Sequence, residues 1–157
     1  MIDTTKRYEL QRSDVERVWA NHLTASAGER WYQRYIGRDV IRRFLASVSA
    51  LDSSGVQRLM IDQPTILNWM IRDVAGKALS YAGERLAVLD RFLKVLAGAG
   101  LVGADLLAEY RVGHGRRSWR CLARALQAEK PETALTALRQ VSPPPGPLTA
   151  HIRSYID

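Results

Sequence analysis

The apolar residues of the chain recur mainly at helical spacing. In one segment, Leu86, Leu89 and Leu93 are separated by three and four residues, which places them on one face of an α-helix. Strand-like alternation is missing, and Gly and Pro fall between the helical segments instead of marking hairpins. The pattern therefore predicts an all-α protein. The expected helices cover residues 13–25, 29–51, 63–75, 80–97, 104–110, 118–129 and 131–141.

Residues with strong positional preferences mark the ends of these helices. Asp62 is expected to cap a helix whose first turn contains Pro64, where the missing N–H of proline costs nothing. Gly76 ends that helix, and Ser80 is expected to cap the next one. Residues 52–55 have the composition of a turn.

Composition excludes several classes of protein. Of the 157 residues, 46% are hydrophobic and 25% are charged, as in a soluble globular domain and unlike a disordered chain. No apolar run approaches the roughly 18 residues of a membrane span, and the N-terminal residues lack the apolar core of a signal peptide. The single cysteine, Cys121, forms neither an internal disulfide nor a thiolate metal site. We therefore expect a cytoplasmic protein without membrane contact.

The sequence holds no catalytic constellation. No metal-spaced His or Cys cluster, phosphate-binding glycine loop or zinc-protease motif occurs. The histidines His22, His114 and His151 lie in different segments. A pair of Cys121 and His114 would lack the third group that orients a catalytic base. We expect a protein that is not an enzyme by itself and has no metal, cofactor or small-molecule substrate.

Positive charge is in excess and unevenly distributed. The chain has 23 Lys and Arg against 16 Asp and Glu, a net charge of +7, and residues 77–124 carry five of these seven charges. No acidic residue occurs from Tyr110 to Ala128, where Trp119 stands among arginines and 111–117 is expected as a basic loop. Arginine suits phosphate, and interleaved aromatic residues are typical of nucleic-acid surfaces, although a solvated surface is the alternative. The candidate phosphate contacts in this stretch are Arg116, Arg117 and Arg120.

A second group of arginines is spaced four residues apart, with one further neighbour. On a continuous helix the spaced residues share one face and repel each other by a few tenths of a kcal/mol per pair. Such a helix either has an anionic partner or is broken or kinked at Gly37. The group consists of Arg30, Arg34, Arg38, Arg42 and the neighbouring Arg43.

A third group surrounds the expected start of the helix at residue 80. Lys77, Ser80, Tyr81 and Arg85 place two cations and two hydroxyls there. Free N–H groups and the helix dipole favour phosphate at such a helix start. The alternative is an ordinary N-cap beside two solvated cations.

Several short segments between Tyr35 and Leu106 follow one another in a characteristic order and spacing. The segments are Tyr35, Phe44-Leu45, Gly55-Val56, Ile61-Asp62, Ile66, Trp69, Leu79-Ser80, the run from Arg85 to Leu93, Ala99-Gly100-Leu101-Val102 and Asp105-Leu106. Residues 35–106 thereby resemble the N-terminal core-binding (SAM-like) domain of the tyrosine recombinase, or phage integrase, family. The resemblance implies a small helical bundle. Residues 1–34 and the Pro-rich linker lie outside it, and the fold expected for the chain is this bundle with an extra N-terminal helix and a C-terminal helical extension.

The resemblance also implies a role on DNA. In this family the domain clamps one side of duplex DNA, opposite the catalytic domain, and further recombinase protomers bind the same DNA. The final helix with the residues before it, and the first helix, approach the duplex. The contacts implied here are Lys77, Ser80, Tyr81, Arg85, Arg42 and Arg43.

The resemblance ends before any catalytic domain. The family's catalytic Arg, Lys, His-x-x-Arg box and nucleophilic Tyr find no match after residue 106, and Tyr155 lacks their surroundings. We therefore expect a fragment, or a stand-alone piece, that binds DNA without cutting or joining it. The expected parts are an N-terminal helical extension (1–34), the core-binding bundle (35–106), a basic linker with helices (107–141), and a Pro-rich linker that starts a further helix (142–157).

The sequence thus predicts double-stranded DNA binding as the non-catalytic part of a site-specific recombinase, in DNA integration and recombination of a mobile element. Two alternatives stay open. A helix-turn-helix transcription regulator predicts dimers and palindromic half-sites, although no convincing short turn between two helices is visible. A protein-interaction module predicts that the basic face meets an acidic partner or a second copy of the chain.

Overall fold

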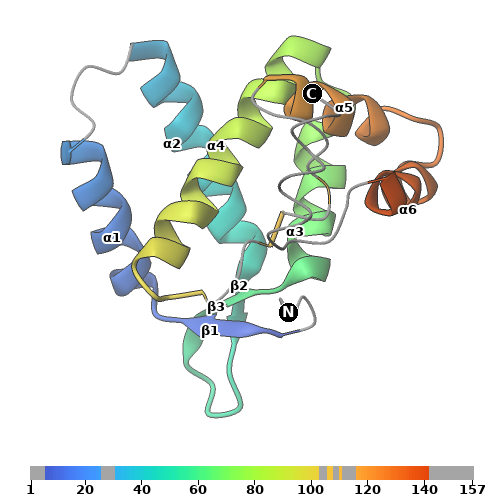
Figure 1. Ribbon diagram of the computed structural model, residues 1–157. Helices are drawn as coiled ribbons and strands as arrows, with labels where there is room; N and C mark the ends of the chain where they lie inside the picture. The colour runs from blue at the N-terminus through green and yellow to red at the C-terminus, as the bar shows by residue number, and fades with distance from the viewer. Residues whose placement is uncertain (1–5, 26–30, 103–105, 108–109, 111–115, 142–157) are drawn as a thin grey trace, which may run out of the picture.

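Helix α4 (Leu79–Gly98) lies at the centre of the fold, which the computed structural model describes for residues 6–25, 31–102, 106–107, 110 and 116–141 (Figure 1). The other helical elements are α1 (Arg12–Ala25), α2 (Trp31–Val48), α3 (Gln63–Trp69), the π-helix η1 (Met70–Val74), α5 (Arg116–Leu126) and α6 (Pro131–Val141). Helices α1, α2, η1 and α5 all pack against α4, and α6 packs against α5. The predicted helical character is confirmed in this coarse form.

A small sheet at one end of the bundle corrects the expectation of an all-α protein (Figure 1). Strands β1 (Tyr8–Leu10) and β2 (Ser49–Leu51) both pair antiparallel with the central strand β3 (Gln57–Ile61). Two of these strands have three residues and the third has five. Segments of that length are too short to show alternation, and the last three residues of β3 are all buried. The pattern that usually reveals a strand was therefore absent.

The hairpin between β2 and β3 contains the turn expected at residues 52–55. The Asp52 carboxylate accepts hydrogen bonds from the Ser54 hydroxyl at 2.6 Å, the Ser54 amide at 2.9 Å and the Val56 amide at 3.0 Å. Led by the Ser54 hydroxyl, these bonds lower the pKa of Asp52 to about 2. Gly55 has a φ of +82°, a conformation that favours glycine. The helix expected over 29–51 accordingly ends at Val48.

The predictions of helix ends have mixed outcomes. Asp62 is confirmed as the cap of α3, because its carboxylate accepts the Thr65 amide at 2.9 Å while the Thr65 hydroxyl accepts the Asp62 amide at 3.0 Å. Ser80 is not a cap, since α4 starts at Leu79 with Ala78 as its N-cap and has no side-chain cap. Helix α2 runs unbroken through Gly37.

One hydrophobic core crosses the boundaries expected at residues 34 and 106. It includes Val15 and Trp19 of α1, Phe92 of α4 and Leu122 of α5. The Trp19 ring meets Phe92 edge-on at 5.3 Å between centroids, which joins α1 to α4. The segment expected as an N-terminal extension therefore shares its core with the bundle. Residues 142–157 lie outside the described residues.

The C-terminal elements follow the sequence pattern closely. Helix α6 has the bounds expected for it, Pro131–Val141. Helix α5 begins at Arg116, two positions before the expected start at residue 118, and ends at Leu126. The rest of the expected basic loop, 111–115, lies outside the described residues, as does most of the helix expected over 104–110.

Candidate nucleic-acid interface

Arg85 lies at the centre of a buried ion-pair network and not on the surface. Only 1% of its side chain is exposed. Its Nε donates to Asp73 Oδ2 at 3.0 Å and its Nη2 donates to the same oxygen, while its Nη1 donates to Asp39 Oδ2 at 2.8 Å and to the Tyr81 hydroxyl at 3.3 Å. A guanidinium enclosed in this way reaches neither a base edge nor a phosphate. The predicted DNA contact at Arg85 is therefore wrong.

The network ties three elements together. Asp39 belongs to α2, Asp73 to η1, and Tyr81 and Arg85 to α4. Burial alone would lower the pKa of Arg85, but hydrogen bonds from it to Asp73 and Asp39 outweigh burial and raise that pKa. Arg85 is therefore charged throughout the physiological range, and it holds α2 and η1 in place beside α4.

Arg42 and Arg43 lie on the surface at the edge of this network. Their side chains are 72% and 52% exposed, and they reach Asp39 at 2.9 Å and 3.1 Å. Arg43 also approaches Asp73 at 3.7 Å. Burial raises the pKa of Asp39, but hydrogen bonds from Arg85, Arg43 and Arg42 outweigh it and hold that pKa at about 2. Both surface arginines thus share carboxylates that already serve Arg85.

Of the remaining arginines in the four-residue series, the structure describes the side chain of Arg38 only. Arg38 is exposed and forms no ion pair with any residue in the described ranges. Arg30 and the side chain of Arg34 lie outside the described residues. The continuous helix and the carboxylate of Asp39 together explain how Arg42 and Arg43 are accommodated without an anionic partner.

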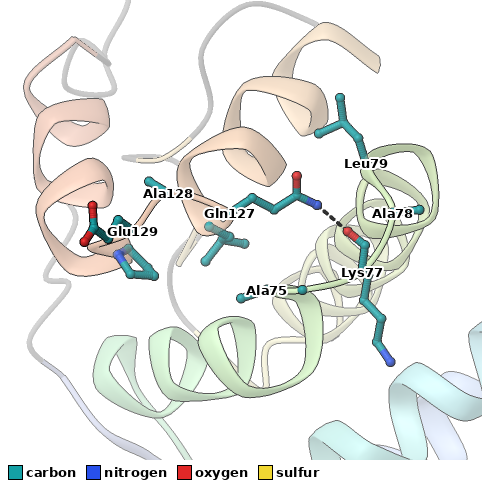
Figure 2. Close-up of a pocket in the computed structure, with 10 residues that line it drawn as sticks. Ala75, Lys77, Ala78, Leu79, Gln127, Ala128 and Glu129 are labelled. Carbon is teal, nitrogen blue, oxygen red and sulfur yellow. Dashed lines mark hydrogen bonds between the residues drawn. The ribbon is translucent and has the colours of Figure 1, made fainter.

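Lys77, Ser80 and Tyr81 gather at the start of α4, as expected. Ser80 is exposed, and Lys77 and Tyr81 are half-buried. The Lys77 carbonyl accepts a hydrogen bond from Gln127 Nε2 just after α5, while its ammonium points away from Gln127 (Figure 2). This bond fixes the end of α5 beside the start of α4. The pocket between them, about 490 Å³, is lined by Ala75, Gly76, Lys77, Ala78, Leu79, Leu126, Gln127, Ala128, Glu129 and Pro131.

A larger groove of about 920 Å³ runs between α4 and α5, and we refer to it as the α4–α5 groove. Arg120 and Arg124, one helical turn apart on α5, are exposed and line it together with Ser80. Neither arginine forms an ion pair within the part of the chain that the structure describes. The groove is lined by Ile36, Leu79, Ser80, Gly83, Glu84, Ala87, Val88, Arg91, Trp119, Arg120 and Arg124.

The predicted contacts whose side chains the structure describes therefore lie in three places. Arg42, Arg43, Tyr81 and Arg85 meet in the ion-pair network, whereas Ser80 and Arg120 line the α4–α5 groove. Lys77 lines the smaller pocket. Arg116 and Arg117 open α5, and their side chains lie outside the described residues.

Sequence reasoning missed Arg91 and Arg124 as candidates for this surface. Arg124 follows Arg120 by four residues in a stretch without acids, which predicts one shared helix face. Arg91 is harder to identify, because it lies next to the buried Phe92 and is half-buried itself. Its place in the groove depends on where α5 packs.

The described residues offer little to a metal ion. No three His, Cys, Asp or Glu side chains among them gather as a metal site would require. Cys121 is half-buried on α5, and His22 stacks on Trp19 at 5.1 Å between ring centroids. None of the helices in this part of the chain is long and apolar enough to cross a membrane.

Comparisons with protein-family models, curated proteins and solved structures find no match to this chain. The resemblance to the integrase core-binding domain therefore depends on the sequence segments between residues 35 and 106. The case for a DNA-binding face depends on the charge and geometry of α4 and α5 described above.

Proposed function

We propose that the chain binds double-stranded DNA through the face that α4 and α5 form together. Arg120 and Arg124 would contact phosphates from one side of the α4–α5 groove, and Ser80 from the start of α4. Lys77 adds a cation at the same end of α4. Phosphate neutralisation by such residues is the main source of affinity in DNA-binding domains of this size.

The observation that carries this proposal is that Arg120 and Arg124 are exposed and form no ion pair with another described residue. Several surface arginines of the described residues are matched by a carboxylate, for example Arg12 by Glu16 at 2.8 Å and Arg17 by Asp14 at 3.2 Å. The exposed Arg38 and Arg72 are unmatched within the described ranges, but each has an aspartate as its neighbour in the sequence. Arg120 and Arg124 are exposed without such a match in that part of the chain, in a stretch that holds no acid. Their field is available to an external anion.

The ion-pair network has a supporting part in this proposal. Arg85 fixes α2 against α4 through Asp39, and thereby sets where Arg42 and Arg43 stand beside the DNA-binding face. These two arginines would add weaker phosphate contacts, because each already forms an ion pair with Asp39 that a phosphate would have to weaken or replace. Arg85 itself positions other residues and does not touch DNA.

We further propose that this binding serves a site-specific recombinase of the tyrosine recombinase family, with the chain supplying the non-catalytic, DNA-clamping part. The mainly helical bundle agrees with the expected architecture in its coarse form. Because α5 packs along α4, we propose that α4 approaches the duplex at its start, where Ser80 is exposed. Strand exchange would require catalytic residues from elsewhere.

One observation favours a second candidate, a helix-turn-helix regulator. Residues 75–78 form a short turn between η1 and α4, with Gly76 at a φ of +87°, although the sequence showed no convincing turn there. However, α5 packs along α4 and places Trp119 beside Gly83. This flank restricts insertion of α4 into a major groove. Dimers that bind palindromic half-sites would favour this candidate.

Fluorescence anisotropy with random-sequence duplex DNA, from about 50 to 200 mM salt, tests the proposal. We expect log affinity to fall linearly with log salt. Replacing both Arg120 and Arg124 by Ala should weaken binding and reduce the slope by about 0.9 for each phosphate that is no longer neutralised. The matched control replaces Arg12 and Arg17 by Ala, which removes the same charge from α1. Absence of binding at the lowest salt, or equally weakened binding in both double variants, would overturn the proposal.

A further inference from the structure

The α4–α5 groove has apolar lining residues that phosphate binding leaves unused, and we refer to them together as its floor. They are Leu79, Ala87 and Val88 of α4, Trp119 of α5 and Ile36 of α2. Charged rims alone are enough to hold a DNA backbone, which needs no apolar surface between them. The floor therefore calls for a different occupant.

The length of the groove along α4 matches one α-helix. Its lining extends along α4 from Leu79 to Arg91, which corresponds to roughly 18 Å or about three helical turns. Ala87 has a short side chain that would let another helix approach α4 closely, whereas at Gly83 the neighbour is α5 itself, because an added Cβ would stand 3.8 Å from the Trp119 Cβ. The volume of about 920 Å³ is large enough for several apolar side chains.

The charge of the groove indicates which charged residues such a helix would have. Arg120 and Arg124 of α5 line the groove and are exposed, without an ion pair among the described residues. Glu84 is the single acidic residue in the described lining. An entering helix with acidic residues beside its apolar face would complement this excess of positive charge, while a basic one would be repelled.

We propose that the α4–α5 groove binds an acidic amphipathic helix of a partner protein. Apolar side chains of that helix, spaced as i, i+4 and i+7, would enter the floor between Val88 and Trp119. Its Asp and Glu side chains would meet Arg120 and Arg124. This proposal goes beyond DNA binding and is tested without DNA, and the two ligands would compete for Arg120 and Arg124.

The probe is a fluorescein-labelled peptide of about 14 residues, long enough for the groove, with leucines on one helix face and glutamates flanking them. Anisotropy titration with the full chain should give a Kd on the order of micromolar. An isomer with lysine in place of each glutamate should bind about tenfold more weakly or less.

Variants locate the peptide on the protein. Replacing Arg120 and Arg124 by Glu should weaken binding about tenfold or more. Ala87→Phe should do the same by filling the floor, and it leaves the charge unchanged. Two Arg→Glu changes at Arg38 and Arg72, which are exposed and do not line the groove, form the matched control and should leave the Kd unchanged. Circular dichroism and thermal melts check that each variant is folded.

Three results would overturn this proposal. One is absence of peptide binding at millimolar protein. Another is equal affinity for the acidic and basic peptides, which would show that charge plays no part. The third is binding that the variant at Ala87 leaves unchanged while the double charge reversal weakens it, since that pattern describes attraction to a basic surface without entry into the groove.

Discussion

Arg85 and Asp39 are 46 residues apart in the sequence, yet the Arg85 Nη1 donates a 2.8 Å hydrogen bond to Asp39 Oδ2. The same guanidinium binds Asp73, twelve residues before it. One buried charge thus joins α2, η1 and α4. This junction helps to set where Arg42 and Arg43 of α2 lie relative to α4, so a buried residue helps to shape the face that we propose binds DNA.

Removing the buried guanidinium should destabilise the fold strongly. Arg85→Ala leaves two carboxylates without their main partner, and breaking a buried pair in this way costs about 3–5 kcal/mol. Urea unfolding measures the destabilisation. Arg42→Ala removes an exposed partner of the same Asp39 and should cost about 0–1 kcal/mol. Equal destabilisation in both variants would show that Arg85 is not the centre of the network.

The misplacement of Arg85 shows where sequence reasoning stops. Its neighbours Lys77, Ser80 and Tyr81 suggested a phosphate site, and its partner carboxylates lie in other elements. One signal was present: Leu89 and Phe92 follow Arg85 by four and seven residues, and both are buried. An arginine on that stripe faces the interior and requires acidic partners, but tertiary packing decides which acids they are.

Local sequence signals predicted several helix ends correctly, but they did not predict the pairing of strands that are far apart in the sequence. The bounds of α6 and the cap at Asp62 depend on neighbouring residues, and both are confirmed. Strand β1 exists because Tyr8 pairs with Ile61 of a remote segment. A strand of three residues is too short for its sequence to predict a pairing partner in a remote segment. The α4–α5 groove likewise arises only when the two helices pack.

The stability of the fold should fall in acid, in part through Asp39. Its pKa of about 2 lies below the ordinary 3.8, so ionised Asp39 stabilises the native state above the ordinary pKa. That contribution is lost as the pH falls from about 4 to about 2. Asp39→Asn should therefore be less stable than the wild type at pH 7, with the difference shrinking toward pH 2. Urea midpoints at several pH values measure this, and a difference independent of pH would contradict it.

The capping box of α3 should contribute measurably to stability. Asp62→Ala removes the acceptor of the Thr65 amide and should cost about 1 kcal/mol. Asp62→Ser keeps a capping oxygen and should recover most of this stability, whereas the ion pair with Arg7, which is 61% exposed, adds little. Hydrogen exchange at the Thr65 amide gives a local readout. Unchanged exchange in the alanine variant would show that the cap does not hold this helix end.

Replacing Gly83 by alanine should stabilise the protein. Gly83 lies inside α4, and an added Cβ would stand 3.8 Å from the Trp119 Cβ, an ordinary contact. Relief of backbone entropy should therefore yield about 0.5–1 kcal/mol in urea unfolding. Gly100→Ala is the matched control and should destabilise, because Gly100 has a φ of +78°. A stabilised Gly83 variant would show that packing of α5 on α4 does not require glycine at this position. Destabilisation above about 1 kcal/mol would instead show that α5 packs more tightly on α4 than this spacing allows.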